Sequence, residues 1–421
     1  MSRRRTTLIV AAALAAVGIA VGVPWLVTPG GGSAAHGTEL VGHQVRLTPS
    51  DGAATGRLAA GEQAFALQLL QHTAGSGNVT VAPASLATAL AMLENGAAGS
   101  TRSELARVLD GADDNAGWRA LTADWSRAAA ASGSALDTAN GTWLQQGFPV
   151  KQGYLDALRS YYDSGVWTVD FTGHGAAALA AIDAWTRQQT HGKITKLFDR
   201  LDPATVLVLA DAEYFEAEWA TRFDPSKTRD AAFVRADGRT VTAPFMSDSE
   251  TRYPSAVTPD YAAVQLPYQG GRFAALAIMP TRESLSSFVA GLTPDRLASL
   301  VSGLRPMAVD LQLPKFTVRS TVDLGRTLAD MGMPTAFTAA ADFSAMTPEP
   351  VSVSQVLQRT YLAVSEKGTE AAAVTGIGLS MSAAAGPPLQ VRLDHPFLFL
   401  VRDTRTGAIL FASSVQDPTA G

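Results

Sequence analysis

The chain is predicted to be an α+β protein with large antiparallel sheets. Helical and strand-like patterns alternate along it in unsegregated order, and no internal repeat is visible. Hydrophobic residues make up 47% of the 421 positions and charged residues 17%, which is enough apolar side chain for a sizeable core. The chain has no cysteine, so the fold must depend on packing without disulfides. We expect one large domain, because single cores of mixed architecture reach this length.

Helical patterns dominate the first half of the chain. The apolar stripe of residues 57–72 fits an amphipathic helix only loosely. The next predicted helix, residues 85–94, is rich in Ala and Leu. Thr101 and Glu104 have the spacing of a capping box, and Gly192 is placed to end the segment that runs from residue 175 to about 189. The predicted helices cover residues 57–72, 85–94, 101–109, 175–189 and 323–331.

Strand patterns dominate the second half. Val309, Leu311 and Leu313 alternate with polar residues, which predicts a strand with one buried face. The short connections at 269–271 and 403–407 each separate two apolar runs and therefore predict hairpins. The predicted strands cover residues 206–209, 264–266, 273–279, 309–313, 397–401 and 408–413.

The first thirty residues have the pattern of an export segment. Three arginines precede residues 8–27, twenty apolar or small residues without a charge. At a rise of about 1.5 Å per residue such a helix spans a bilayer, whereas Ala34 and Ala35 offer a cleavage point. The Ser2-Arg3-Arg4 start also weakly resembles a twin-arginine signal. Both an uncleaved anchor and a cleaved signal peptide stay open, and either one places the protein body outside the cytoplasm.

We therefore predict three parts. Residues 1–30 are a signal peptide or signal anchor, residues 31–56 are a flexible tether of small and polar residues, and residues 57–421 form the folded domain. The protein is expected to be secreted, or held at the cell membrane with this domain outside.

Several classes of function lack the residues that they need. The net charge is −5 and no basic stripe occurs, so nucleic-acid binding is not expected. No Gly-x-Ser-x-Gly, His-Glu-x-x-His or phosphate-loop pattern is present. His395, which precedes Pro396, is predicted to enter a strand and not to act as a base. We expect no enzyme activity, no metal and no cofactor.

Residues 366–388 are an unusual loop. They are small and punctuated like a linker, yet they alternate with a period of two. One face, which includes Thr369, Ala371 and Thr375, is small or apolar and uncharged, while the only acid beyond Thr369, Glu370, is on the other face. Such a segment can be a loop, and it can also enter a sheet as a central strand.

The start of this loop resembles the hinge of inhibitory serpins, in composition and in order. Motifs near residues 82–90, 214–225, 313–316, 331–333, 341–344 and 394–399 resemble the same family, and the resemblance extends from about residue 57 to 418. The chain resembles a bacterial-looking member with an N-terminal signal or anchor. The hinge residues are Glu366, Lys367, Gly368, Thr369, Glu370, Ala371, Ala372, Ala373, Val374 and Thr375.

The resemblance implies the serpin fold, with three β-sheets, eight or nine α-helices and an exposed reactive-centre loop at about 366–390. It implies an irreversible suicide-type inhibitor of serine, or cysteine, proteases, in which the cleaved loop inserts into the main sheet and traps the acyl-enzyme. The alternatives are a non-inhibitory serpin that acts as a binding or chaperone module, and an anchored structural or adhesion protein. The chain is expected to be a monomer.

The family's spacing from Glu366 predicts a reactive bond between Ser382 and Ala383. Bonds after Met381 and after Leu379 are alternatives, because the loop is about three residues longer than usual on its far side. All of these residues are small or apolar. The expected partner is therefore an elastase-, subtilisin- or chymotrypsin-like protease.

The resemblance also implies a region where the main sheet opens. The family usually has a hydrogen-bonded serine, asparagine and histidine there, and this chain has different residues at all three positions. Either a substitute network exists or the opening is tuned differently, and both alternatives stay open. The residues of this region are Ala82, Pro83, Ser85, Asp211, Trp219 and Gln358.

Overall fold

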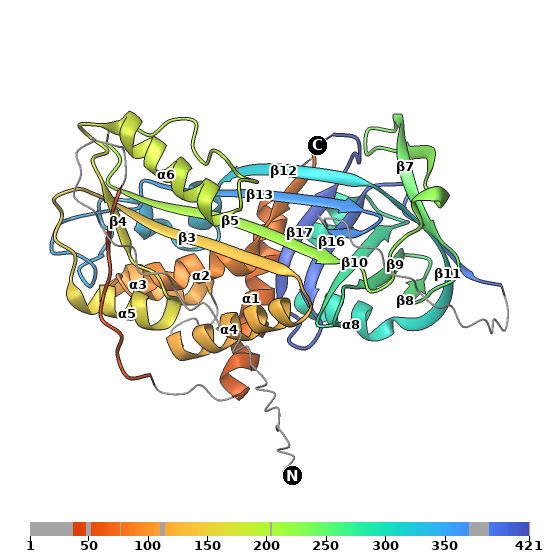
Figure 1. Cartoon of the computed structure of the whole chain (residues 1–421), viewed down its shortest axis with the longest axis horizontal. Helices are drawn as coiled ribbons and strands as arrows, with labels where there is room; N and C mark the ends of the chain where they lie inside the picture. Colours follow the sequence, from red (N-terminus) through yellow and green to blue (C-terminus); the bar gives the residue numbers. More distant parts are fainter. Residues whose placement is uncertain are drawn as a thin grey trace, which may run out of the picture. The chain divides into compact units, whose positions relative to one another are not determined.

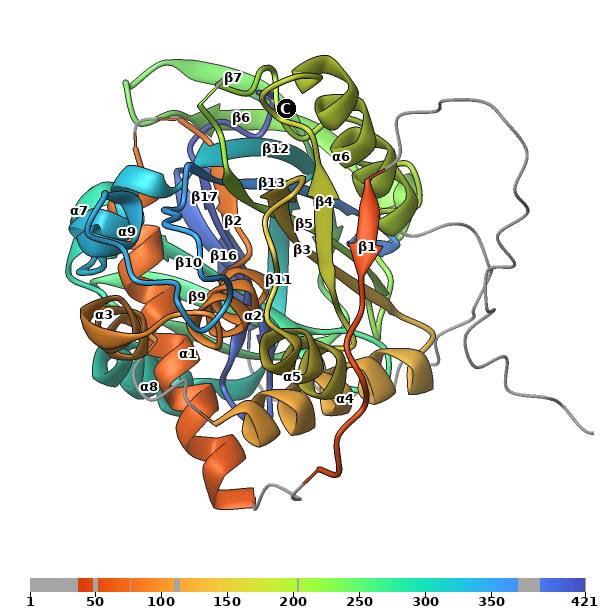
Figure 2. The same cartoon turned by 90° about the vertical axis from the view of Figure 1, so that its left-hand side faces the viewer.

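The fold consists of two sets of hydrogen-bonded strands with helices packed around them (Figures 1 and 2). The structure is a computed structural model that describes residues 37–47, 52–75, 77–109, 114–202, 204–369 and 387–420. These residues belong to one compact unit, Ala35–Gly421. The predicted mixed α+β fold with several sheets is confirmed.

The first set is a seven-stranded sheet. Along β5, odd-numbered residues face the main core and even-numbered residues face helix α6, as the period of two requires. In spatial order the strands are β1 (Thr38–Leu40), β4 (Val166–Val169), β3 (Ala135–Gln145), β5 (Leu207–Glu218), β14 (Gly368–Thr369), β13 (Gln355–Ser365) and β12 (Phe316–Asp323).

The second set has ten strands. Strand β11 pairs with β8 along its first half and with β7 along its second half, so it passes from one sheet into another. All residues of β10 are buried, which explains its continuous apolar run. The strands are β2 (Val79–Val81), β17 (Ile409–Val415), β16 (Phe397–Asp403), β10 (Phe273–Pro280), β9 (Tyr261–Pro267), β8 (Arg252–Val257), β11 (Arg305–Pro314), β7 (Thr240–Asp248), β6 (Arg229–Val234) and, beside β11, β15 (Leu389–Arg392).

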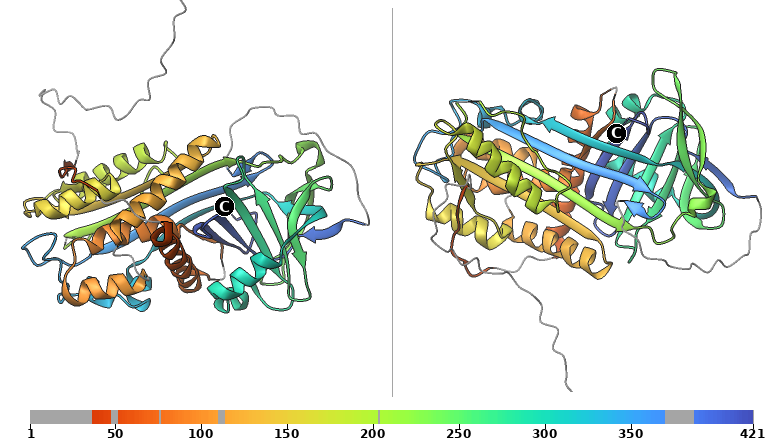
Figure 3. Two further views of the ribbon diagram at one scale, coloured as in Figure 1. Left: turned by 90° about the horizontal axis from the view of Figure 1, so that it is seen from below. Right: turned by 45° about the horizontal axis from the view of Figure 1, so that its top comes forward.

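The described residues form nine α-helices, within the predicted number. Helix α2 is buried along its whole length beneath the seven-stranded sheet, and α6 covers the other face (Figure 3). The helices are α1 (Gly52–Thr73), α2 (Pro83–Glu94), α3 (Gly99–Val108), α4 (Asn115–Ala131), α5 (Gln152–Tyr162), α6 (Gly175–Gln189), α7 (Leu285–Ala290), α8 (Pro294–Gly303) and α9 (Gly325–Asp330). Two short 3₁₀ turns span Pro225–Lys227 and Pro334–Phe337.

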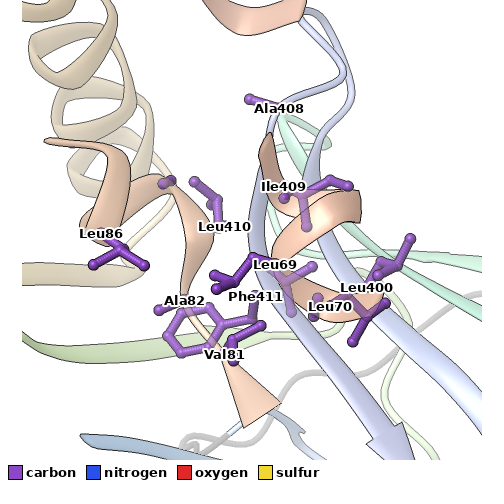
Figure 4. Packing of buried hydrophobic residues seen from close by; sticks show 14 of the residues in the cluster. Leu69, Leu70, Val81, Ala82, Leu86, Leu400, Ala408, Ile409, Leu410 and Phe411 are labelled. Atoms are coloured by element: carbon purple, nitrogen blue, oxygen red, sulfur yellow. The ribbon is translucent and has the colours of Figure 1, made fainter. Parts of the chain in front are cut away.

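The main core joins the two sets of strands. Leu69 and Leu70 of α1 belong to the same buried cluster as Leu86 of α2 and Phe411 of β17, and Figure 4 shows Leu69 beside Phe411. A smaller core lies between α6 and the outer face of β3 and β5. Helix α2 and strand β17 are buried along their whole length, so the layer below the seven-stranded sheet is closely packed.

The predicted flexible tether is wrong where the structure describes it. Thr38–Leu40 pair with Val166–Thr168, and the amide of His43 donates to Asp156 Oδ1 at 2.7 Å. Helix α1 begins at Gly52 and not at residue 57. Sheet pairing with a strand more than a hundred residues away converts a locally loop-like sequence into an edge strand.

The predicted capping box is also wrong. Thr101 Oγ1 accepts from the amide of Asp342 at 2.9 Å, and Glu104 Oε2 accepts from the amide of Thr335 at 2.9 Å. Both side chains therefore satisfy distant backbone groups, and Ala98 begins α3 without a side-chain cap.

The N-terminal export segment lies outside the described residues. Within those residues, no helix is both long and apolar enough to cross a membrane. The predicted signal or anchor therefore stays a prediction.

Candidate functional site

The site is the seam between β5 and β13 in the seven-stranded sheet. Residues 355–361 of β13 pair directly with residues 208–214 of β5, in parallel. Beyond this ladder the two strands accommodate β14, whose Gly368 pairs with both Glu218 and Ser365 (Figure 3). The seam is therefore closed along one part and already holds the start of an extra strand at its end.

Thr369 is the innermost described residue of this extra strand. Its side chain is fully buried, and its Oγ1 lies 2.6 Å from the hydroxyl oxygen of Tyr268. The Tyr268 ring stacks on Trp219, with centroids 4.6 Å apart. These contacts form a fitted pocket for a small polar side chain.

The backbone around the hinge is also held by Trp219 and its neighbours. Trp219 Nε1 donates to the carbonyl of Ser365, and its amide donates to the carbonyl of Lys367, both at 2.9 Å. The amide of Phe223 donates to the carbonyl of Glu366 at 2.9 Å. The turn from β13 into β14 is thus attached to the segment that follows β5.

Gly368 is required by the close approach of two backbones. A Cβ at this position would lie 2.1 Å from the carbonyl oxygen of Ala217 and 2.7 Å from Cα of Glu218. Its φ of +155° is also unfavourable for residues with a side chain. Any other residue would push β14 away from β5.

Glu366 is anchored beside the hinge. Lys315 Nζ lies 2.8 Å from Glu366 Oε2, and the Thr228 hydroxyl donates to Oε1 at 2.9 Å. Burial raises the pKa of Glu366. The bonds from Lys315 and Thr228 lower this pKa by more than burial raises it, so the net shift is downward. The carboxylate is therefore charged at neutral pH and ties the hinge to two neighbouring elements.

A polar network lies under the closed part of the seam. Asp211 of β5 accepts from the Ser85 hydroxyl at 2.9 Å and from Gln358 Nε2 at 3.2 Å. Gln358 also makes two bonds to the backbone of Ala82, both at 2.9 Å. Asn140 Nδ2 donates to the carbonyl of Ser85 at 3.1 Å. The network connects β3, β5 and β13 to the start of α2.

Burial raises the pKa of the Asp211 carboxyl to about 7, although the bonds from Ser85 and Gln358 lower it. Glu213, two residues along the same face, has a pKa raised well above the usual range by burial and by the charges of Asp211 and Glu62. Burial likewise raises the pKa of Glu62 to about 8. Three acids near the seam thus share a low-dielectric environment in which protonation is favoured.

A seam in the main sheet with an extra strand started at its end, at Gly368 and Thr369, agrees with what the family resemblance implies. The chain matches the family described as "Serpin (serine protease inhibitor)" over residues 60–418. The chain belongs to the serpin family. Members of this family are generally protease inhibitors and not enzymes, and the fold described above is the serpin fold.

Individual serpins resemble this one over most of their length. An uncharacterized serpin-like protein of Thermococcus kodakarensis is 34% identical, over 85% of each chain. The native structure of the thermophilic serpin tengpin has a TM-score of 0.80 and 25% identity, and covers 91% of this chain and 100% of tengpin. Human thyroxine-binding globulin with its bound hormone has a TM-score of 0.78 and 28% identity, and covers 87% of this chain and 100% of that one.

The structure brings the described part of the predicted hinge to the end of the seam. Glu366, Lys367, Gly368 and Thr369 lie beside Trp219 there. The remaining hinge residues, Glu370 to Thr375, and the predicted reactive bonds at Leu379, Met381, Ser382 and Ala383, lie outside the described residues. Their roles stay predictions.

The predicted sheet-opening region contains its own hydrogen-bonded network. Ala82, Ser85, Asp211 and Gln358 are joined by hydrogen bonds, so a substitute network exists. Pro83 begins α2 directly beside it, where a missing amide costs no hydrogen bond.

Sequence reasoning missed three residues of the site: Asn140, Tyr268 and Thr228. Asn140 and Thr228 carry no local motif. Tyr268 stands just before the hairpin glycines, where it is one of many aromatic residues. The register of β3 against β5 places Asn140 at the seam, and the β9–β10 hairpin places Tyr268 there. Thr228, just before β6, reaches the hinge only through its bond to Glu366.

Proposed function

We propose that this serpin is an irreversible, suicide-type inhibitor of serine proteases. The target cleaves the loop that follows Thr369, and the severed segment then extends β14 between β5 and β13 while the protease remains attached as an acyl-enzyme. The single observation that supports this most is the hinge itself. Thr369 is seated between the two strands, and insertion continues a pairing that has already begun.

The residues that would follow Thr369 fit the same path. On its inward face the proposed strand has small or apolar residues, so no charge would be buried during insertion. The closed ladder of seven paired positions, Gln355 to Tyr361, would have to open for the strand to reach full length. New backbone hydrogen bonds on both sides of the inserted strand would replace those lost, since each edge gains a partner.

The proposed target is an elastase-, subtilisin- or chymotrypsin-like protease, and the proposed reactive bond is Ser382–Ala383. The residues before this bond and before the alternatives are small or apolar and include no arginine. A trypsin-like target is therefore disfavoured. We place this activity outside the cytoplasm, either secreted or attached through residues 1–30, on the basis of the N-terminal apolar segment.

Incubation with each protease class tests the proposal. An elastase- or subtilisin-like enzyme should give a complex that survives denaturation, and mass spectrometry of the released C-terminal peptide should identify the cleaved bond. Formation of such a complex with a trypsin-like enzyme alone would contradict the proposed specificity. Cleavage without any complex, together with no rise in melting temperature, would contradict the inhibitory mechanism.

That last outcome would favour the alternative of a non-inhibitory serpin. The similarity to thyroxine-binding globulin shows that this fold also serves ligand binding in another protein. Residues 366–375 of this chain are small on the inward face, however, and a bulky or charged residue there would have favoured that alternative.

A further inference from the structure

A cavity of about 620 Å³ lies under β3 and reaches Glu213 of the seam strand β5. It lies where the first half of β3 has no partner on the β4 side, because β4 pairs only with residues 142–145. Helix α4, the end of α5 and the buried helix α2 form its walls (Figure 2). A volume of this size is within the range of small-molecule sites in proteins.

The floor of the cavity contains a buried carboxyl group that Thr138 hydrogen-bonds through only one of its oxygens. Glu213 is 1% exposed, and its Oε2 has no hydrogen-bond partner among the described residues. Around it the floor consists of Ala84, Thr88 and Met92 from α2. An unpaired buried oxygen of this kind costs free energy that a donor on a ligand would recover.

The charges around the cavity favour a cation. Glu39 and Asp163 line the rim, and Arg119 is the only basic residue in the described lining. The Arg119 guanidinium already donates to the carbonyl of Ser160 at 2.6 Å, so it is directed to α5. Asp163 is ion-paired with Arg159. A ligand cation would therefore meet Glu39 at the rim and, once it is ionised, Glu213 at the floor, with no free base in the described lining to oppose it.

Aromatic rings provide the rest of the wall. Tyr161 and Trp167 are half-buried beside the opening, and Trp125 and Trp185 are buried. Aromatic faces attract cations and also stack on the apolar body of a ligand. The described residues contain no group of three metal-ligating side chains, so a metal ion is a poorer fit than an organic cation.

We propose that this cavity binds a primary amine that carries an aromatic body on a slender arm, with its ammonium group directed to Glu213. The near-complete burial of Glu213 sets the specificity, because a small terminal ammonium with N–H groups to donate suits a carboxyl that is only 1% exposed. A quaternary ammonium is too wide and has no N–H to donate. The binding does not depend on the proposed inhibitory function.

Binding should also release a proton. Burial and the charges of Asp211 and Glu62 raise the pKa of Glu213 well above the usual range, so the empty site holds a neutral acid. Asp211 is on the same strand and Glu62 comes from α1, while Arg119 from α4 and the rim acids Glu39 and Asp163 complete the charged groups near it. An ammonium beside Glu213 favours its ionised form, and the proton leaves to the buffer.

Calorimetric titration of the whole chain with 2-phenylethylamine tests the proposal at pH 7. We expect saturable binding, at one site, with release of about one proton judged from buffers of different ionisation enthalpy. The isosteric alcohol 2-phenylethanol and the trimethylammonium analogue should bind at least about tenfold more weakly. Equal binding of all three compounds, or no binding of the amine, would overturn the proposal.

Variants locate the site independently. Glu213→Gln keeps the shape of the side chain and removes the ionisable carboxyl. It should weaken amine binding at least about tenfold and abolish the proton release. Glu216→Gln, on the opposite face of the same strand, is the matched control and should bind as the parent does. Thr122→Trp fills the cavity from α4 and should abolish binding of every compound. Unchanged binding in Glu213→Gln and Thr122→Trp would show that the amine sits elsewhere.

Discussion

The two parts of the seam are held together in different ways. At the hinge end, β14 separates β5 from β13, and aromatic stacking with a single buried hydroxyl pair holds the inserted residue. At the closed end, the strands pair directly, and a carboxyl, an amide and a hydroxyl lie beneath them. The hinge end is therefore prepared to receive a strand, while the closed end must break polar contacts before a strand can pass.

The difference shows where the barrier to insertion lies. Extending β14 by two residues requires only further backbone pairing at the hinge end. Extending it past Tyr361 and Tyr214 separates Gln358 from Asp211, which leaves buried polar groups to be satisfied again. We infer that the network beneath the closed end, and not the hinge pocket, controls how readily the seam opens.

The largest effect is expected from Thr369→Arg. The guanidinium would enter the pocket of Tyr268 without a counter-ion, at a cost of about 3–5 kcal/mol for an unpaired buried charge. β14 should leave the seam, and the protein should be cleaved as a substrate and form no stable complex. Lys367→Arg, which keeps its charge at a half-buried position, is the control. Full inhibition by the Thr369→Arg variant would refute the role of the hinge.

The next effect concerns the closed end and depends on pH. In the native state the Asp211 carboxyl keeps its proton up to about pH 7. In the unfolded chain the same carboxyl loses the proton near its ordinary pKa of 3.8. The native state thus binds more protons between these values, so the stability contributed by Asp211 falls as pH rises through this window and is constant above it.

Asp211→Asn removes this penalty. Relative to the parent, the variant should show no gain below about pH 4 and a rising gain up to about pH 7, with an upper bound of about 4 kcal/mol. Its amide can still bond Ser85 and Gln358. Melting temperatures of both proteins across this pH range measure the difference. Asp224→Asn removes an exposed acid whose pKa is lowered by its bonds to Ser226, and it should give no such gain. A difference in melting temperature between variant and parent that does not change with pH would contradict the raised pKa of Asp211.

A smaller effect is expected from Tyr268→Phe at the hinge end. The change leaves Thr369 Oγ1 buried without its partner, which costs about 1–2 kcal/mol. Hydrogen exchange should accelerate at the amides of Ala217 and Thr369 and stay unchanged around Asp211. Tyr253→Phe is the control. It removes a buried hydroxyl that bonds Asp248, and Tyr253 belongs to β8 in the ten-stranded set and not to the seam. Faster exchange at both ends would mean that the two parts of the seam are not independent.

The smallest effect is expected from Lys315→Gln. The Lys315–Glu366 ion pair is partly exposed, with 37% of the lysine side chain accessible, so its loss should cost about 1 kcal/mol or less. The melting temperature should fall by about 2 °C or less. A drop of many degrees would show that the ion pair holds the hinge more strongly than solvent screening allows.

Local patterns predicted many elements of the fold. The alternation of Val309, Leu311 and Leu313 corresponds to β11, and the hairpins at 269–271 and 403–407 are present. The segment at 175–189 is helix α6. Patterns failed where a side chain or a strand found a distant partner, as with Thr101, Glu104 and Thr38–Leu40. Tertiary bonds outweigh a local motif because each satisfies a group that the fold would otherwise bury unpaired.

The candidate site was predicted in part. The resemblance to serpins predicted the hinge, of which the structure describes Glu366 to Thr369, and it also predicted the altered opening region. Whether those residues form a network depended on the placement of Ser85 beneath β5 and of Asn140 beside it. Nothing in the chain near Ala82 indicates that Gln358 bonds to its backbone.

The sequence alone determined the α+β class and the family resemblance, and it predicted a loop able to exist in two conformations, because composition and period are local properties. The tertiary structure decided that Thr369 is seated against Tyr268, that Asp211 is bonded on two sides and that one carboxyl oxygen of Glu213 has no partner among the described residues. Each of these depends on strand register and on burial, which arise only when segments far apart in the chain are packed together.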